Sequence, residues 1–334
     1  MTIWVGELIS SIGSGMTAFA VAVYVYQLTD SATMVSLAAL LAFMPTILLS
    51  PVGGILADRY DRRLMMIIGD SFSAAGLLFI FISIQTGHGG VLPVFTGITI
   101  SSVFVALLEP AYRATVTDLL SEEEYAKASG LVQIAANSKY LISPFLTGLL
   151  LSVTDIRTIL IIDMATFFVT VFTIASVRKS IRAVKPDSNS FNFFREFKDG
   201  MKSIISDKGV SSLVVLMAFM CFFVAFIQTL MAPMILAFAD AKILGIMESV
   251  SAVGMLIGSV IIGILNIKKN YSGILMISLM AAGVFMAMTG TTTNICMIVV
   301  FCILFFAALP FANTCAEVLV RIRIPNAVQG RAWG

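Results

Sequence analysis

Long apolar stretches separated by short polar segments make up most of the chain. A helix needs about 20 largely apolar residues to cross a membrane. By this criterion the sequence predicts ten spanning helices, at Ile3–Leu28, Thr33–Leu56, Leu64–Ile84, Leu92–Val116, Ala126–Leu151, Thr158–Val177, Val210–Phe238, Ile243–Leu265, Ser272–Thr289 and Ile295–Val320. We therefore expect an all-α membrane protein.

One polar connection is much longer than the others. It runs from Arg178 to Lys208 and divides the first six predicted spans from the last four. Within it, Phe191–Ser206 has apolar residues at near-helical spacing, which predicts an amphipathic helix at the membrane surface. A flexible linker is the alternative. The expected domains are a six-helix bundle at 1–177, a cytoplasmic linker with the amphipathic helix at 178–209, and a partial four-helix bundle at 210–334.

The distribution of Lys and Arg predicts the orientation of the chain. If the N-terminus is cytoplasmic, the outside loops hold only Arg157 and Lys242, and the other loop Lys and Arg residues lie inside. Cytoplasmic loops of membrane proteins carry such an excess of positive charge. We therefore expect a multi-pass protein of the cell membrane, either inner or plasma membrane, with a cytoplasmic N-terminus.

Composition supports a membrane location and excludes several function classes. Hydrophobic residues make up 59% of the chain and charged residues only 12%, whereas soluble domains carry about 25% charged residues. The net charge is only +2 and no basic stripe is present, so a nucleic-acid partner is not expected. The 4 cysteines lie in apolar runs and only 1 histidine is present, so we expect no metal site and no cofactor. The sequence has no phosphate-binding loop and no cluster of nucleophile and base, so we expect no enzyme activity.

The most specific motif lies between the second and third predicted spans, in the segment GGILADRYDRR that begins at Gly53. Its glycines allow two helices to approach closely. Its carboxylate lies where a helix leaves the membrane, and its arginines form a cationic turn that can hold two helical bundles in one state. The residues assigned to this conformational lock are Gly54, Asp58, Arg59, Arg62 and Arg63.

This segment resembles the loop-2/3 signature of the major facilitator superfamily. The segments Pro110–Leu131 and Trp4–Thr29 resemble the macrolide-efflux and siderophore-exporter branch of that superfamily. The resemblance implies two six-helix bundles around a central cavity that opens alternately to either side. It also implies an antiporter that confers drug resistance, exporting a lipophilic drug, macrolide or siderophore in exchange for protons. By the same resemblance, Asp70 and Asp118 are expected to pair with the arginines of the lock. The expected partners are the small lipophilic substrate, protons and membrane lipid, and we expect a monomer.

The sequence also departs from the family pattern. The family has twelve spans, whereas the tenth predicted span here is followed almost at once by Gly334. We therefore expect ten of the twelve helices, in a chain truncated at its C-terminal end. Two alternatives to the exporter stay open: a truncated remnant that does not transport, and the membrane subunit of an ATP-driven transporter.

Ionisable residues inside predicted spans are the candidates for coupling and substrate binding. A charged side chain at the centre of a bilayer costs about 2.5–3.5 kcal/mol on insertion scales, so such residues are paired or functional. Glu109 and Arg113 lie four residues apart and share a helix face, so they form either a proton-binding pair or a structural ion pair. Lys139 is the candidate for contact with an anionic substrate in the cavity; the alternatives are that it pairs with a carboxylate or extends along its stem to the membrane surface. The candidates for proton coupling are Glu109, Arg113, Glu7, Asp163 and Glu248.

Overall fold

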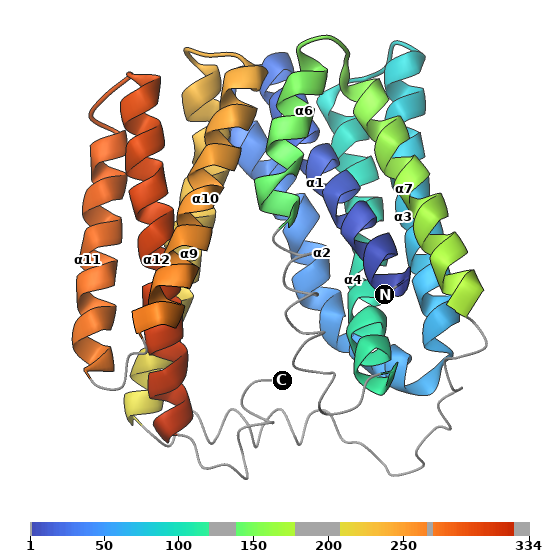
Figure 1. The fold of residues 1–334 in the computed structure, drawn as a ribbon. Coiled ribbons are helices and arrows are strands. Elements are labelled where there is room, and N and C mark those ends of the chain that lie inside the picture. Colours follow the sequence, from blue (N-terminus) through green and yellow to red (C-terminus); the bar gives the residue numbers. More distant parts are fainter. Residues whose placement is uncertain (1, 120–137, 178–207, 266–269, 324–334) are drawn as a thin grey trace. The chain divides into compact units, whose positions relative to one another are not determined.

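The computed structural model describes residues 2–119, 138–177, 208–265 and 270–323, and the regular elements in these ranges are helices (Figure 1). They are α1 (Thr2–Thr29), α2 (Ala32–Arg59), α3 (Arg62–Gln85), α4 (Val91–Leu119), α6 (Ser143–Leu151), α7 (Ile156–Val177), α9 (Lys208–Leu236), α10 (Ala241–Leu265), α11 (Tyr271–Thr289) and α12 (Ile295–Arg323).

The expected class is confirmed, because α1 to α4 and α9 to α12 are each long and apolar enough to cross a membrane. The helix α7 coincides with the predicted span at Thr158–Val177, and α6 is the described end of the predicted span at Ala126–Leu151. The predicted amphipathic helix at Phe191–Ser206 lies outside the described residues.

Short polar side chains begin several of these helices. The first N–H groups of a helix have no partner within it, and Asp, Asn or Ser at the N-cap can accept from them. The carboxylate of Asp155 accepts from the N–H of Arg157 in α7, and that of Asp240 accepts from the N–H of Ile243 in α10. The side chain of Asn294 caps α12 in the same way. These polar turns explain why one apolar helix ends and the next begins within a few residues.

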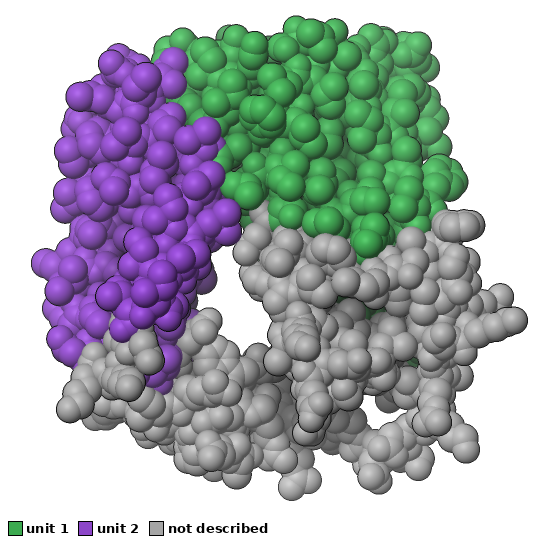
Figure 2. Space-filling view, in the orientation of Figure 1, with its two compact units in different colours: residues 1–187, 229–249 green, residues 188–228, 250–334 purple. Residues whose placement is uncertain are grey.

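The described residues form two compact units, which are coloured separately in Figure 2. Unit 1 takes in residues 1–187 and 229–249, and unit 2 takes in residues 188–228 and 250–334. The domain boundaries expected from the sequence, at 177 and 209, stay a prediction.

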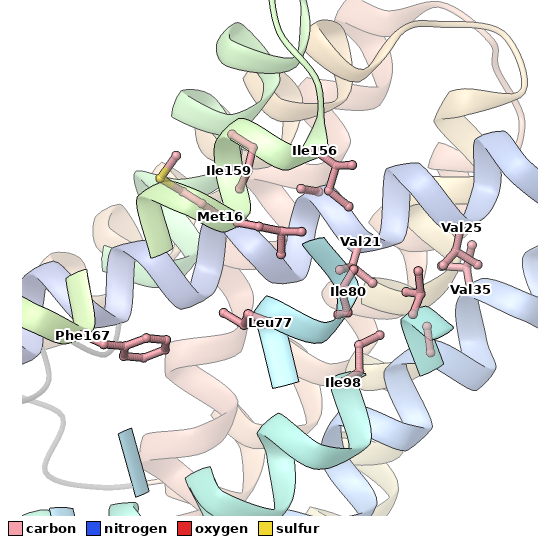
Figure 3. Close-up of a cluster of buried hydrophobic side chains, with 14 residues drawn as sticks. Met16, Val21, Val25, Val35, Leu77, Ile80, Ile98, Ile156, Ile159 and Phe167 are labelled. Atoms are coloured by element: carbon pink, nitrogen blue, oxygen red, sulfur yellow. The ribbon is translucent and has the colours of Figure 1, made fainter. Parts of the chain in front are cut away.

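In unit 1, α1 packs against α2, α6 and α7, whereas α4 packs against α2 and α3. The core of the unit is a cluster of hydrophobic side chains contributed by five helices (Figure 3). Met16 of α1, Leu77 of α3 and Ile159 of α7 are almost completely buried in it. Burial of such side chains and their dense packing fix the positions of α1, α3 and α7 relative to one another.

Close backbone contacts add to this packing in unit 1. At the crossing of α3 and α4, a Cβ atom on Gly76 would lie 2.5 Å from the carbonyl oxygen of Gly97, so neither helix has room for a side chain there. Ser73 and Ser101 share a hydrogen bond of 2.7 Å across the same interface. Small residues at a helix crossing permit this approach, which is common in membrane proteins.

A polar network ties the loop ends of unit 1 together. The hydroxyl of Tyr24 in α1 donates to the carbonyl oxygen of Gly89 over 2.7 Å. Arg157 forms an ion pair with Asp155 and donates to the amide oxygen of Gln85 at the end of α3. The hydrogen bond from Arg157 holds the pKa of the Asp155 carboxyl below its usual value. These contacts join the ends of α1, α3 and α7 at one rim of the unit.

Unit 2 is built from α11 and α12, which pack along their length, together with parts of α9 and α10. Leu275 of α11 and Ala312 of α12 are buried against residues of α9. On α10, a Cβ atom on Gly254 or Gly258 would collide with the carbonyl oxygen of Ile303 or Ala307 of α12. The two glycines, four residues apart, let the backbones of these helices touch.

Candidate functional site

The predicted lock motif lies at the turn between α2 and α3. The two helices are separated only by Tyr60 and Asp61, both of which are exposed. A Cβ atom on Gly53 would lie 2.7 Å from the carbonyl oxygen of Ala106. The absence of a side chain at this position therefore permits the close approach of α2 to α4. At Gly54 a Cβ atom would meet nothing within 4 Å.

The charged part of the lock is described only in part. Asp70 is buried on α3, with 3% of its surface exposed. Its expected pairing with the arginine cluster stays a prediction, as does that of Asp118. The structure does not describe the side chains of Asp58, Arg59, Arg62, Arg63 and Asp118.

The candidates for proton coupling do not form one cluster in the described structure. Glu109 and Arg113 lie in α4 and Glu7 lies in α1, but their side chains are outside the described residues. Glu248 lies in α10 and is partly buried. Asp163, in α7, is the candidate whose surroundings the structure defines most completely.

Asp163 is a carboxylic acid almost completely enclosed by helices. Only 1% of its surface is exposed. The hydroxyl of Thr17 in α1 donates to its Oδ2 over 2.5 Å. The hydroxyl oxygen of Thr166, one helical turn along α7, lies 3.5 Å from its Oδ1. Within the part of the chain that the structure describes, Asp163 makes no ion pair.

The helix α1 makes room for this carboxyl group at Gly13. A Cβ atom at that position would lie 2.7 Å from Oδ1 of Asp163 and 2.7 Å from the hydroxyl oxygen of Thr166. Real Cβ atoms essentially never approach other heavy atoms so closely, so any larger residue would displace one of the two groups. The acid therefore lies directly against the backbone of α1.

A second glycine places Lys139 on another side of α1. A Cβ atom on Gly15 would lie 2.8 Å from Cγ of Lys139 and 2.5 Å from the hydroxyl oxygen of Ser143. Ser143 donates to the carbonyl oxygen of Ile12 over 2.8 Å, which fixes the start of α6 to α1. The ammonium of Lys139 lies 5.9 Å from the ring centroid of Tyr140. Residues 13 and 15 are about 200° apart around a helix, so Asp163 and Lys139 approach α1 from different sides.

Hydroxyl groups continue along α7 beyond the acid. Thr170 is buried and donates to the carbonyl oxygen of Gly6 over 3.4 Å and to that of Thr166 over 3.3 Å. Asp163, Thr166 and Thr170 follow the helical period, so they form one polar face that α1 covers. The other buried residues in the described part of this helix, residues 156–170, are apolar.

The chemistry available at this site is the binding and release of a proton. An ionised carboxylate is very costly to bury without a counter-charge, whereas a neutral acid needs only hydrogen-bond partners. Among the described residues, no group of three or more His, Cys, Asp and Glu side chains is arranged to hold a metal ion.

Part of this site was not predicted from the sequence. Asp163 and Lys139 were expected as single ionisable residues, but Gly13, Thr17 and Thr166 were not. The available signal was a Gly-x-Gly-x-Thr segment in the first span and a threonine three residues after the acid. Neither of these two sequence signals shows which face of α1 packs against which face of α7.

The family model of the Major Facilitator Superfamily matches residues 3–334. The chain belongs to this superfamily of transporters. It is 28% identical to macrolide efflux protein A of Streptococcus pyogenes over 336 residues, which cover 99% of this chain and 83% of that protein. It is 24% identical to the enterobactin exporter EntS of Shigella flexneri over 150 residues, which cover 45% of this chain and 37% of the exporter.

A solved structure of the same superfamily shows the same fold. The nucleoside transporter NupG matches with a TM-score of 0.74 and 14% identity, over 99% of this chain and 84% of that one. The transporter described here is therefore a multi-pass membrane protein that carries small molecules. The resemblance inferred from its lock motif and from its first and fourth spans is confirmed.

Proposed function

We propose that this transporter exports a lipophilic small molecule, of the macrolide or siderophore kind, in exchange for protons. Its similarity to macrolide efflux protein A extends over 83% of that protein, and part of the chain is similar to an enterobactin exporter. In this proposal the protein works as a monomer in the cell membrane, has a cytoplasmic N-terminus and moves its substrate by alternating access. The lock at Gly54, Asp58, Arg59, Arg62 and Arg63, with Asp70 and Asp118, holds one of the two states.

The buried carboxyl group of Asp163 is the observation that carries the proton coupling. Ionisable residues inside a membrane protein are costly and mark ion or proton sites. A proton can drive a conformational change only if it binds the two states with different affinity. In this proposal water reaches the enclosed acid in one of the two states, and Asp163 gains or loses its proton there. Asp163 thereby links protonation to the positions of the helices around it.

The other ionisable candidates have secondary roles in this proposal. Lys139 lies on another side of α1 from the acid, and its positive charge acts on Asp163 across the helix when the acid is ionised, or on an anionic group of the substrate. Glu248, Glu109, Glu7 and Arg113 remain candidates for a second proton site or for substrate binding.

Transport in inside-out membrane vesicles tests this proposal. An imposed pH gradient, acid inside, is expected to drive uptake of a radiolabelled macrolide by the wild-type protein. Asp163→Asn keeps the size of the side chain but cannot release a proton, so we expect gradient-driven uptake to fall to the level of vesicles without the protein. Membrane insertion is measured in parallel by immunoblotting.

The matched control is Asp240→Asn. Asp240 is an exposed N-cap residue of α10, and asparagine caps a helix as well as aspartate does. We expect this variant to transport normally. Undiminished gradient-driven uptake by Asp163→Asn would remove Asp163 from the mechanism. Uptake by the wild type that survives collapse of the proton gradient but stops without ATP would instead favour an ATP-driven transporter.

A further inference from the structure

Thr17 of α1 makes the shorter of the two hydroxyl contacts to the carboxyl group of Asp163. The hydroxyl oxygen of Thr17 lies 2.5 Å from Oδ2, whereas that of Thr166 lies 3.5 Å from Oδ1. Hydrogen bonds between two oxygen atoms measure about 2.5–3.0 Å, and the shortest of them involve an ionised or acidic group. Of the two contacts, the one with Thr17 is therefore the strong hydrogen bond.

The helix α1 presents this hydroxyl on the face where it makes room for the acid. Thr17 follows Gly13 by one helical turn, so both residues lie on the side of α1 that meets Asp163. The side chain of Thr17 is buried, with 8% of the residue exposed. The hydrogen bond joins α1 to α7 across 146 positions of the chain and is shielded from bulk water.

A hydroxyl group can donate one hydrogen bond and accept others. As a donor, Thr17 binds an ionised carboxylate at Oδ2. As an acceptor, it can take the proton of a neutral acid on the same oxygen. Its own hydrogen then has the carbonyl oxygen of Gly13, four residues back, as the ordinary acceptor for a threonine in a helix. Thr29 of the same helix bonds to the carbonyl oxygen of Val25 in this way.

We infer that Thr17 is the positioning residue for the proton of Asp163, accepting it from Oδ2 in the neutral acid and donating to Oδ2 in the ionised acid. The inference rests on the proposed role of Asp163 in proton coupling. When the acid is deprotonated, the O–H bond at Oδ2 breaks, its electron pair stays on the carboxylate, and the proton passes to water. A hydrogen bond to an ionised group is the stronger one, so the connection between α1 and α7 depends on whether Asp163 holds a proton.

The helices that pack against α7 bring no second partner of this kind to the acid. They are α1, α3 and α6, and α6 has no ionisable side chain. The other ionisable residues on these elements are Glu7, Tyr24 and Tyr26 of α1, Arg62, Arg63 and Asp70 of α3, and Arg157 of α7. Lys139, on another side of α1, is the residue whose charge acts on Asp163. Within the described part of the chain Asp163 makes no ion pair, so its direct partner is the hydroxyl of Thr17.

Infrared spectroscopy of the purified protein tests the inference without a transport assay. The carbonyl stretch of a protonated acid is separate from the amide bands, and the band of Asp163 is identified by its loss in Asp163→Asn. Thr17→Val removes the hydroxyl at nearly constant size. The carbonyl bond of a carboxylic acid stiffens when the carboxyl group loses a hydrogen bond. We therefore expect the band of Asp163 to move to higher wavenumber in Thr17→Val.

Three further variants separate this role from a general effect on packing. Thr17→Ser keeps the hydroxyl and is expected to return the band to its wild-type position. Thr166→Val makes the same change at the hydroxyl that donates to the backbone carbonyl oxygen of Asp163 over 2.7 Å, and is expected to leave the band in place. Thr17→Ala serves if the valine variant does not fold. The inference is overturned by a wild-type band position in Thr17→Val or Thr17→Ala, by an equal shift in Thr166→Val, or by the same shift in Thr17→Ser.

The same experiment distinguishes this inference from the proposed function. If no protonated band is lost in Asp163→Asn at any pH, the acid holds no proton and both proposals fail. If the band shifts as expected while Asp163→Asn exports at the wild-type rate, the role of Thr17 stands and the role of Asp163 in export fails.

Discussion

Gly13 determines how closely α1 approaches the carboxyl group of Asp163. In most helices a glycine-to-alanine change is favourable by about 1 kcal/mol. Here the new methyl group would lie 2.7 Å from both Oδ1 of Asp163 and the oxygen of Thr166. It would have to displace the side chain of Asp163 or of Thr166, both of which are buried and hydrogen-bonded, and such overpacking costs about 1–3 kcal/mol.

We therefore predict that Gly13→Ala lowers the melting temperature of the protein in detergent and weakens proton-driven transport. Gly283→Ala is the matched control, because a Cβ atom there would meet nothing within 4 Å. This variant should be at least as stable as the wild type. Equal stability and transport in the two variants would show that Gly13 is not in contact with the site.

At this scale the sequence identifies single residues but not their contacts. Asp163 is recognisable as a candidate because a carboxylate in an apolar span is rare. Thr17 was not recognised, because a threonine in a spanning helix usually bonds to its own backbone, as Thr29 and Thr99 do here. The contact of Thr17 with Asp163 joins residues 146 positions apart in the chain. It depends on how α1 and α7 are rotated against each other, which hydropathy does not determine.

The packing of helix α10 against helix α12 also depends on glycine residues. Gly254 and Gly258 lie on one face of α10, and a Cβ atom added at either position would collide with a backbone carbonyl oxygen of α12. Because a backbone group cannot move aside as a side chain can, the two helices would have to separate.

We predict that Gly254→Ala and Gly258→Ala each destabilise unit 2, by about 1–3 kcal/mol if the helices yield only in part. Gly263→Ala, on the same helix, has nothing within 4 Å and should be neutral. Thermal unfolding in detergent, followed by circular dichroism, measures the difference. A loss of stability in Gly263→Ala as large as in the other two would contradict this account of the helix contact.

The positions of the helices followed from the sequence to within a few residues, because membrane spans are defined by length and hydropathy. The predicted span at Leu92–Val116 corresponds to α4 at Val91–Leu119, and the one at Val210–Phe238 to α9 at Lys208–Leu236. The chain has a turn at Ile142, just before α6. The sequence signal there was Pro144, which cannot donate a hydrogen bond to the preceding turn.

For the whole molecule, the family and the class of fold were recognisable from the motif at Gly53–Arg63, and both are confirmed. The substrate was not, because it depends on which side chains from several helices face a common cavity. The central claim of this account is therefore about the driving force: export is coupled to protons through Asp163.

The most direct measurement of this claim is proton movement driven by the substrate. The protein is reconstituted in liposomes that contain a pH-sensitive dye, with no pH gradient and with a macrolide on one side only. We predict that protons move in the direction opposite to the macrolide, so that macrolide flow into the liposomes raises the internal pH. We expect Asp163→Asn to abolish this change and Asp240→Asn to retain it. Macrolide flow without proton movement in the wild type, or unchanged proton movement in Asp163→Asn, would contradict the account.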